Sequence, residues 1–495
     1  MFKHAQLETV KAWIENPAHR SMPLHLRIQR AVRELILNGT LGVGRPLPAS
    51  RGLATSLGVS RDTVEAAYTQ LQLEGFIERH VGVGSFVSQR AKRSTRRLAP
   101  RKTTGAEAIR LSQRGTAIFE SGGLREFSFP RPFAPGVPET RSFPLPTWER
   151  LQRQILKEYD SQALAHSPPQ GAERLRRAIA DYVSLERGAR ATAERVLVLT
   201  SSQQALTLCA TVLLDAGDGI CVEDPGYPGA RKAFEAAGLR CAPVPLDDQG
   251  MLVDRLDVIG KDAKAVSLTP SHQFPTGSTL SLERRLAAIE WAHRKRAWIL
   301  EDDYDSEFHY AGKPTACVQG LDAQERTIYI GTFTKSMFPG LRIAYMVLPA
   351  PLVEPMTVAR TLLDGHSATL AQLTLARFME GGHFGAHVRG MRNVYVERRD
   401  TLVRLVRKYL GDYVEPCVPV GGLQMQCVLT CDIREELAVA AAAKAGVDLL
   451  GLTPLHASRR DRAGFLMGFA AYSPREMEIA VRKLRDVLRA LAQRT

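Results

Sequence analysis

The sequence predicts an α/β protein in which a small helical unit with a two-stranded wing precedes a large domain built on a mostly parallel sheet. From about residue 126 onward, short apolar runs alternate with longer helical patterns, as is typical of strands connected by helices. Before them, three helical patterns and a hairpin pattern fill residues 1–88. A chain of 495 residues is also too long for one domain.

The composition excludes some classes of protein. The chain contains no run of 18 or more apolar residues, so no membrane span is expected. The first residues lack the apolar segment of a secretory signal, and we therefore expect a cytoplasmic protein. The net charge of +14 suits a polyanionic partner. Seven scattered cysteines predict reduced thiols, and no histidine pair accompanies Cys427 and Cys431, so no metal site is predicted.

The first unit predicts a helix-turn-helix. Apolar residues recur at helical spacing over residues 24–36 and predict a first helix, which Asn38-Gly39 is expected to end. A second helix is expected to start at Ser50 as its N-cap and to end at Gly58. A third starts after Ser60, another good N-cap, and the short turn between the two helices is typical of helix-turn-helix motifs.

The end of this unit predicts a wing. Residues 76–87 alternate in polarity around Gly82 and Gly84, which favours a two-stranded hairpin. At the start of the third helix, Arg61 and Thr63 are exposed beside backbone N–H groups that favour phosphate. The alternative is that Arg61 and Arg51 are solvated surface charges on a small packing module.

Residues 48–75 carry a resemblance to a known family. Their pattern, Pro48-Ala-Ser-Arg51 through Ser60-Arg61-x-Thr63 to Glu74-Gly75, resembles the winged helix-turn-helix of GntR-family transcription regulators. The resemblance implies binding to double-stranded DNA in the major groove, with the wing at the backbone or minor groove. The residues expected at DNA are Arg51, Ser60, Arg61, Thr63, Arg79, His80 and Gly82.

Residues 89–125 are predicted to be a flexible basic linker. Arginines and lysines alternate there with Ser, Thr, Ala and Pro, and no apolar periodicity appears. The linker either adds nonspecific DNA affinity through counterion release or serves as a plain tether.

The large domain, residues 126–495, is expected to place its functional residues at the carboxyl ends of parallel strands. A helix is expected over residues 281–295, and a smaller α+β subdomain after about residue 385. The central strands are predicted at 195–199, 219–223, 265–268, 297–300 and 327–330.

The most informative of these strand ends carries Lys335. Thr332 and Thr334 precede the lysine after an apolar run, and Arg342 follows seven residues later. An amine in this place can form a Schiff base with an aldehyde cofactor, while hydroxyls and an arginine can hold a phosphate. The alternative for a lone lysine after a strand is a surface position.

Three further motifs predict the same cofactor site. Residues 200–204 open a helix and can cradle a phosphate with hydroxyls and backbone amides. Tyr227, after a Pro-Gly turn, can stack on a ring or be a core aromatic. In Glu301-Asp-Asp-Tyr-Asp305, a carboxylate can pair with a pyridine nitrogen, although Asp302 or Asp303 can also be a helix cap. Together the four motifs predict pyridoxal 5'-phosphate (PLP).

The large domain resembles fold-type I aminotransferases, and the whole chain resembles the MocR/GabR subfamily of GntR-family regulators. Thr269-Pro-Ser-His-Gln-Phe-Pro-Thr-Gly277 and Glu301-Asp-Asp-Tyr-Asp-Ser-Glu-Phe308 are close to the subfamily pattern. The resemblance implies an internal aldimine at Lys335. It also implies that Asp302 faces the ring nitrogen, Tyr304 the ring oxygen and Tyr227 the ring face, while Ser202, Gln203, Thr332, Thr334 and Arg342 hold the phosphate.

The chain departs from the family at three positions. His166 stands where the subfamily commonly has a tyrosine that reaches the phosphate of the neighbouring subunit, and we expect it to contact the cofactor there. Phe274 stands, as is usual in the subfamily, where aminotransferases commonly have an asparagine bonded to the ring oxygen, so that bond is missing or comes from elsewhere. Leu466 is nearest to the position of their carboxylate-binding arginine, for which Arg231 or the 392–399 cluster could compensate.

The resemblance therefore implies a PLP-dependent transcription regulator that senses an amine, an amino acid or PLP itself. No catalytic residue is assigned, because without the arginine we expect residual or half-transamination activity at most. The alternatives are a competent aminotransferase that carries a DNA-binding domain, and a regulator that has lost its cofactor. The subfamily also implies a head-to-tail homodimer, with each DNA-binding domain over the partner's large domain.

Overall fold

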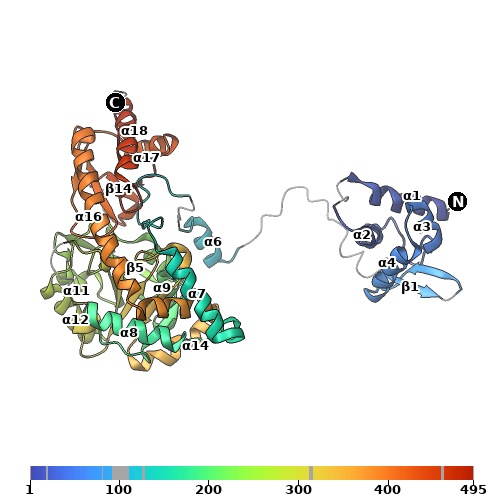
Figure 1. Cartoon of the computed structure of the whole chain (residues 1–495), viewed down its shortest axis with the longest axis horizontal. Helices are drawn as coiled ribbons and strands as arrows, with labels where there is room; N and C mark the ends of the chain where they lie inside the picture. Colours follow the sequence, from blue (N-terminus) through green and yellow to red (C-terminus); the bar gives the residue numbers. More distant parts are fainter. Residues whose placement is uncertain are drawn as a thin grey trace. The chain divides into compact units, whose positions relative to one another are not determined.

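The computed structural model describes residues 2–17, 21–80, 82–91, 111–124, 129–310, 316–458 and 462–493. The chain forms two compact units, Met1–Arg110 and Leu111–Thr495 (Figure 1). Most of the predicted linker lies outside the described residues, and its described part includes a helix, α6 (Gln113–Glu120). Among the described residues, no helix is both long and apolar enough to span a membrane.

The first unit is a helical core with a two-stranded wing, as predicted. Its elements are α1 (Phe2–Glu15), α2 (Leu24–Leu37), α3 (Ser50–Leu57), α4 (Arg61–Leu73), β1 (Ile77–His80) and β2 (Gly84–Val87), and the two strands pair antiparallel. The sequence does not predict α1, which buries Val10 and Ile14 against this core.

The caps of the helix-turn-helix follow the sequence, with one correction. Gly58 ends α3 in the left-handed conformation (φ 65°), which glycine adopts without a steric penalty. The Ser60 hydroxyl caps α4 by accepting a hydrogen bond from the Thr63 N–H at 3.3 Å. Ser50 is not an N-cap: Ala49 holds that position, and the Ser50 hydroxyl instead donates to Glu65 Oε1 at 2.6 Å.

The second unit alternates strands and helices through most of its length. Its first part contains α6, α7 (Leu145–Tyr159), α8 (Glu173–Arg187), β3 (Val196–Leu199), α9 (Ser202–Leu213), β4 (Gly219–Asp224), α10 (Pro228–Ala236), β5 (Arg240–Asp247), β6 (Gly250–Met251), α11 (Leu256–Ile259), β7 (Ala263–Leu268), α12 (Leu282–Lys295), β8 (Trp298–Asp303), α13 (Val318–Leu321), β9 (Thr327–Thr332), β10 (Ala344–Val347), α14 (Val353–Leu363) and α15 (Thr369–Glu380).

Eight strands form one sheet in the order β3-β10-β9-β8-β7-β4-β5-β6. The strands from β9 to β5 are parallel, and β10 is antiparallel to both of its neighbours, so β3 also runs parallel to β9. The five predicted strands and the predicted mostly parallel sheet are confirmed. Since all five strands point the same way, their carboxyl ends meet at one edge of the sheet.

Successive side chains of a strand point to opposite faces, and in the central strands β3, β10 and β9 the side chains of both faces are buried. Leu197 and Leu199 pack into the cluster that includes α9, α10 and α14. Val196 and Val198 pack on the other face with α7, α8 and α15. Burial on both faces explains why these strands are continuous apolar runs in the sequence.

The carboxyl-terminal part has the predicted α+β character. A long helix, α16 (His383–Leu410), leads to four antiparallel strands in the order β11-β12-β14-β13, with α17 and α18 packed beside them (Figure 1). The remaining bounds are β11 (Val414–Cys417), β12 (Gln424–Leu429), α17 (Glu435–Lys444), β13 (Leu450–Gly451), β14 (Gly464–Gly468) and α18 (Pro474–Ala492).

Candidate functional site

The predicted cofactor motifs follow strands whose carboxyl ends share one edge of the sheet. Ser202 and Gln203 follow β3, Tyr227 follows β4, Asp302 lies near the end of β8, and Lys335 follows β9. Residues more than a hundred positions apart in the chain are thereby placed at one edge.

Lys335 is half-buried at this edge. Its Nζ atom donates to the carbonyl oxygen of Gly136 at 2.6 Å. The turn before it is held by Thr332, whose hydroxyl donates to Thr334 Oγ1 at 3.0 Å and accepts from the Thr334 N–H at 3.2 Å. The two threonine hydroxyls are thus bonded to each other in the turn that precedes the lysine.

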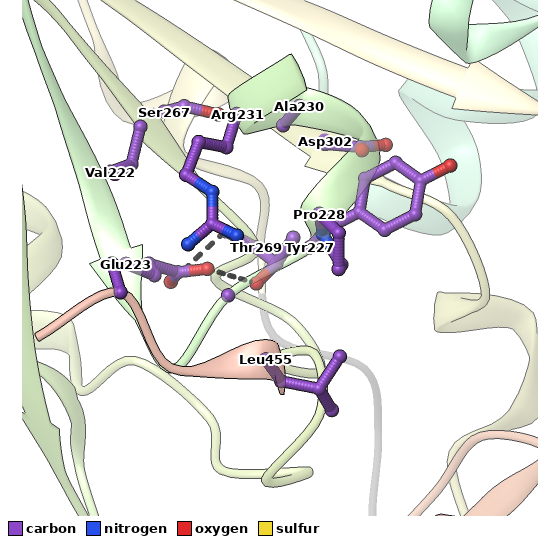
Figure 2. A pocket seen from close by; sticks show the side chains of 12 residues that line it. Val222, Glu223, Tyr227, Pro228, Ala230, Arg231, Ser267, Thr269, Asp302 and Leu455 are labelled. Carbon is purple, nitrogen blue, oxygen red and sulfur yellow. Dashed lines mark hydrogen bonds between the residues drawn. The ribbon is translucent and has the colours of Figure 1, made fainter. Parts of the chain in front are cut away.

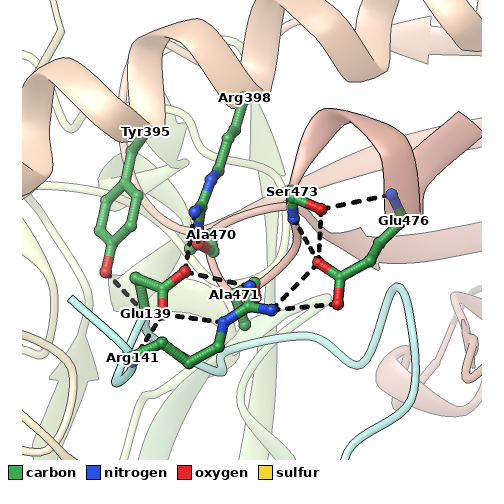
Figure 3. Close-up of polar contacts among 8 residues, drawn as sticks. All are labelled: Glu139, Arg141, Tyr395, Arg398, Ala470, Ala471, Ser473 and Glu476. Atoms are coloured by element: carbon green, nitrogen blue, oxygen red, sulfur yellow. Dashed lines mark hydrogen bonds and ion pairs between the residues drawn. The ribbon is translucent and has the colours of Figure 1, made fainter.

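The segment that contacts Lys335 is anchored to the carboxyl-terminal part of the chain. Glu139, three residues after Gly136, is buried and pairs with Arg141 and Arg398, while its backbone N–H donates to the Tyr395 hydroxyl (Figure 3). Arg141 also pairs with Glu476 of α18 at 3.0 Å. Although burial by itself raises the pKa of Glu139, hydrogen bonds from these arginines hold it below its usual value. The segment that carries the Gly136 carbonyl is thus linked to α16 and α18 by an ion-pair network outside the sheet.

The neighbouring carboxylates Asp302 and Asp303 have different surroundings. Asp303 Oδ2 accepts from Arg187 Nε at 2.9 Å, from the Tyr329 hydroxyl at 2.6 Å and from the Ser306 hydroxyl at 2.9 Å. Asp302 is also buried, and the Oδ1 atoms of both carboxylates have no hydrogen-bond partner among the described residues, so the two differ in the cation and the two hydroxyls that Asp303 binds through Oδ2. Asp303 is therefore occupied by the fold, and Asp302 is the acceptor left for a bound group.

The surrounding charges shift the pKa values of Asp302 and Asp303 in opposite directions. Burial and the neighbouring carboxylates, Asp303 first among them, raise the pKa of Asp302 to about 7, while Lys335 opposes this shift. Burial would raise the pKa of Asp303 too, but Arg187 lowers it below its usual value. A buried carboxyl without a cationic partner is a good acceptor for a protonated ring nitrogen.

Asn substitutions at the two positions should separate these roles. Asp303→Asn is expected to lower the unfolding free energy by about 3–5 kcal/mol, because it leaves Arg187 buried without its partner. Asp302→Asn is expected to keep the stability of the cofactor-free protein but to weaken PLP binding roughly 10- to 150-fold. Urea unfolding and PLP titration of both variants measure this, and equal losses of stability would contradict the assignment.

A pocket opens beside Asp302. Figure 2 shows the Tyr227 ring and the Asp302 carboxylate at one side of it, with the Arg231 side chain extending into it from α10. Glu223 at its floor accepts from the Thr269 N–H at 3.2 Å and from the Thr269 hydroxyl, and burial raises its pKa to about 7. The lining residues are Val222, Glu223, Gly226, Tyr227, Pro228, Ala230, Arg231, Ser267, Thr269, Asp302, Leu455 and Ala457.

The aromatic residues of the prediction lie close to one another. The Phe274 ring packs edge-on against Tyr227, with centroids 5.7 Å apart, and against Tyr304 at 6.4 Å. The Tyr304 hydroxyl is 3.3 Å from His272 Nδ1. Burial raises the pKa of Tyr304 well above its usual value, so this hydroxyl keeps its hydrogen and can donate it.

The predicted phosphate cradle is the amino terminus of α9. Ser201 caps the helix by accepting from the Gln204 N–H at 3.2 Å, and Ser202 is the first helical residue. The Gln203 side chain donates to the Gly229 carbonyl at 2.9 Å, so its backbone N–H is the better candidate for a phosphate contact.

Arg342 and His166 lie at the surface of the single chain. Arg342 has a left-handed backbone (φ 54°) shortly before β10, and its side chain is exposed. His166 is exposed too, and its Nδ1 atom is 2.9 Å from His366 Nε2. Their contacts with a cofactor stay predictions.

The predicted DNA-contacting residues lie on α3, on the amino-terminal end of α4 and in the wing. Arg51 and Arg61 are exposed, and Arg61 Nε is 3.5 Å from Glu65 Oε1. Arg79 is less available, since its guanidinium pairs with Glu65 and lies 3.4 Å from Thr69 Oγ1. His80 packs edge-on against Phe86, and Gly82 has a positive φ of 76° at the wing tip.

The position expected for a carboxylate-binding arginine is apolar. Leu466 on β14 is fully buried with Leu452 and Leu455, and Phe274 packs against this cluster. The arginines of residues 392–399 are used elsewhere: Arg392 donates to the Glu307 carbonyl, Arg398 pairs with Glu139, and Arg399 donates to the Pro419 carbonyl. Arg231 is the predicted alternative that does line the pocket.

Sequence reasoning missed three contributors to the site. Gly136 lies in an irregular segment with no motif, and Arg187 is an ordinary residue at the end of a helix. His272 stands inside the quoted motif 269–277, yet nothing in the sequence indicated that it contacts Tyr304.

Comparisons with known proteins identify the families of both units. Residues 24–87 match the model of the bacterial regulatory proteins of the gntR family, and residues 138–484 match that of aminotransferase class I and II. The probable rhizopine catabolism regulatory protein MocR of Rhizobium meliloti is 33% identical, over 95% of this chain and 94% of its own. The pyridoxine biosynthesis regulator PdxR of Corynebacterium glutamicum is 30% identical, over 96% and 97%.

Solved structures resemble the second unit. The multiple substrate aminotransferase of Thermococcus profundus is 27% identical, covers 78% of this chain and 97% of its own, and gives a TM-score of 0.68. LysN, the α-aminoadipate aminotransferase of Thermus thermophilus in complex with N-(5'-phosphopyridoxyl)-L-leucine, is 26% identical with the same coverage and a TM-score of 0.69.

The residues at the sheet edge fit PLP. A half-buried amine suits its aldehyde, the buried Asp302 oxygen suits its ring nitrogen, and a helix amino terminus suits its phosphate. These are the three chemically distinct parts of the molecule.

Proposed function

Because the chain belongs to the MocR/GabR subfamily of GntR-family transcription regulators, with PLP as its cofactor, we propose that it senses a small ligand at Lys335. The ligand is an amine, an amino acid or PLP itself, and the output is occupancy of DNA. The observation that carries this proposal is the amine of Lys335 at the same edge as a buried Asp302 whose Oδ1 atom has no partner among the described residues.

Each residue at the edge has a distinct part in this function. PLP supplies an aldehyde that reacts reversibly with primary amines, so a small amine can compete with Lys335 for it. Asp302 would accept a hydrogen bond from the ring nitrogen, and the Tyr304 hydroxyl would donate one to the ring oxygen. Thr332, Thr334 and the N–H groups at the start of α9 would hold the phosphate.

A screen of ligands tests the proposal. Full-length protein with PLP is mixed with amines, amino acids and free PLP, and each mixture is followed by thermal melting, by visible absorbance and by binding to a DNA fragment that the wild-type protein selects from a random pool. An effector should move all three signals together. If every compound that changes the absorbance leaves DNA binding unchanged, the sensing function is wrong.

The apolar surroundings of Leu466 argue against sustained catalysis. An amino acid whose carboxylate has no bidentate arginine is poorly oriented for repeated proton transfer. In an assay with α-ketoglutarate and a panel of amino acids, we therefore expect no more than about a single equivalent of keto acid per protein chain. Multiple turnovers that disappear in Lys335→Ala would establish a working aminotransferase instead.

We propose that the protein acts as a homodimer in the cytoplasm. Arg342 and His166, the two predicted phosphate ligands that are exposed in the single chain, would be covered by a partner subunit. Leu164 and Leu362, which are 76% and 85% exposed, lie close in sequence to His166 and His366, whose rings are in contact, and add an apolar surface there. A PLP-loaded monomer in sedimentation experiments would contradict the dimer.

A further inference from the structure

His272 is a buried histidine whose ring is fixed by backbone on two sides. It follows β7 and is 6% exposed. A Cβ atom at Gly422 would collide with its Cε1 atom, and one at Gly277 would lie 3.0 Å from its Nε2 atom. Both glycines have positive φ angles, 78° and 75°, so these close approaches depend on glycine.

One nitrogen of this ring faces two oxygens. Nδ1 is 3.2 Å from Asp305 Oδ2 and 3.3 Å from the Tyr304 hydroxyl oxygen. The tautomer with its hydrogen on Nδ1 supplies the donor that the Asp305 oxygen can accept, so we assign the hydrogen to Nδ1. The same N–H then also points toward the phenol oxygen.

The other nitrogen supports this placement of the hydrogen. Nε2 is buried and has no hydrogen-bond partner among the described residues, so a hydrogen there would be left unpaired. A small cavity beside the ring is also lined by Arg187 and Ser306, and these groups have other partners: Arg187 donates to the Ser271 hydroxyl, and the Ser306 hydroxyl donates to Asp303. Asp305 and Tyr304 are thus the groups that meet the ring through Nδ1.

The consequence concerns the hydrogen of the Tyr304 hydroxyl. A phenol oxygen that accepts from Nδ1–H cannot direct its own hydrogen at the same nitrogen, so that hydrogen is available to a bound group. The nearby Phe274 packs on Tyr227 and Tyr304, but its hydrocarbon side chain has no polar atom that could bind the ring oxygen.

We infer that His272, held by Asp305, is a positioning residue that orients the Tyr304 hydroxyl so that it donates to the ring oxygen of PLP. The inference rests on the proposed contact between Tyr304 and PLP. It adds to that contact a chain of three side chains, Asp305, His272 and Tyr304, that sets its direction.

The test follows the visible absorbance of PLP bound to the full-length protein as a function of pH. A donor to the ring oxygen stabilises its negative charge, so a weaker donor makes the bound chromophore hold its proton to higher pH. His272→Leu should raise the midpoint of the absorbance transition by about 0.5–1 pH unit. His272→Asn, whose amide nitrogen can replace Nδ1–H, should stay near the wild-type midpoint.

A double variant separates positioning from a general structural effect. If His272 acts through Tyr304, Tyr304→Phe shifts the midpoint and adding His272→Leu shifts it no further. Additive shifts, or a wild-type midpoint in His272→Leu, would overturn the inference. If His272→Leu fails to fold, His272→Gln, whose amide reaches the Nε2 position instead, must show the shift that His272→Asn lacks.

These results are independent of the sensing function. If His272→Leu leaves the absorbance midpoint unchanged while DNA binding by the wild-type protein still responds to a ligand, only the positioning role is rejected. A wild-type protein whose DNA binding ignores every ligand rejects the sensing function while the midpoint shift can still be measured. A Tyr304→Phe variant with an unchanged midpoint removes the contact on which the inference rests.

Discussion

Replacement of Lys335 by alanine is expected to abolish the response of DNA binding to amines while leaving DNA binding itself intact. The substitution removes the only atom of the side chain that can bond covalently to an aldehyde. It lies outside the first unit, whose hydrophobic core is its own cluster of buried residues. The visible absorbance of the bound cofactor should also be lost, which spectroscopy and DNA-binding titrations with and without effector would measure.

The matched control is Lys264→Ala. Lys264 lies in the same unit, on β7, but is exposed, so its loss removes a positive charge without touching the sheet edge. We expect wild-type absorbance and a wild-type ligand response from this variant. An amine response that persists in Lys335→Ala would show that the ligand acts at another site.

The strands of the large sheet could be predicted because burial on both faces makes them continuous apolar runs. The same rule explains why β5 was not predicted: it contains Pro243 and Pro245 and has mostly half-exposed residues, so it lacks an apolar run. β10 is buried on both faces like β3, and the sequence does not show that it inserts antiparallel between β3 and β9.

The helix α1 was missed for a related reason. It buries only Val10 and Ile14 completely among its described side chains, although Leu7 and Trp13 pack partly buried beside them at helical spacing. Its stability comes from packing against the rest of the first unit, which local sequence does not record.

Motif spacing could identify the site residues but not their hydrogen bonds. In the sequence, Asp302 is preferred over Asp303 only through its distance from Tyr304. The physical reason is that Arg187, which lies far away in the sequence, pairs with Asp303 through its Oδ2 atom. The same holds for His272, because its contact with Tyr304 joins segments 32 residues apart through the close packing at Gly277 and Gly422.

Replacement of Arg61 by alanine is expected to weaken DNA binding roughly 5- to 150-fold, a loss of about 1–3 kcal/mol. Arg61 is the first residue of α4, where the Ser60 cap fixes the helix start and the helix dipole favours phosphate. Its ion pair with Glu65 is exposed, with 54% of the arginine side chain accessible, so the stability of the unit should change by less than about 0.5 kcal/mol.

Arg153→Ala provides the control for charge and helix context. Arg153 is exposed on α7 and forms the same kind of pair, with Glu149 four residues before it, at 3.2 Å. Both variants lose one positive charge from an exposed helical pair, but only Arg61 lies at the proposed DNA surface. Equal DNA affinities for the two variants would remove Arg61 from that surface.

The salt dependence tells which part of DNA Arg61 contacts. If it binds a phosphate, the slope of log affinity against log salt should fall by about 1, and all sequences should be weakened equally. If it binds a base, the preference for the selected sequence over random DNA should decrease instead. We expect the second result, because the first turn of the helix that follows the turn of a helix-turn-helix is the part that reaches base edges in the major groove.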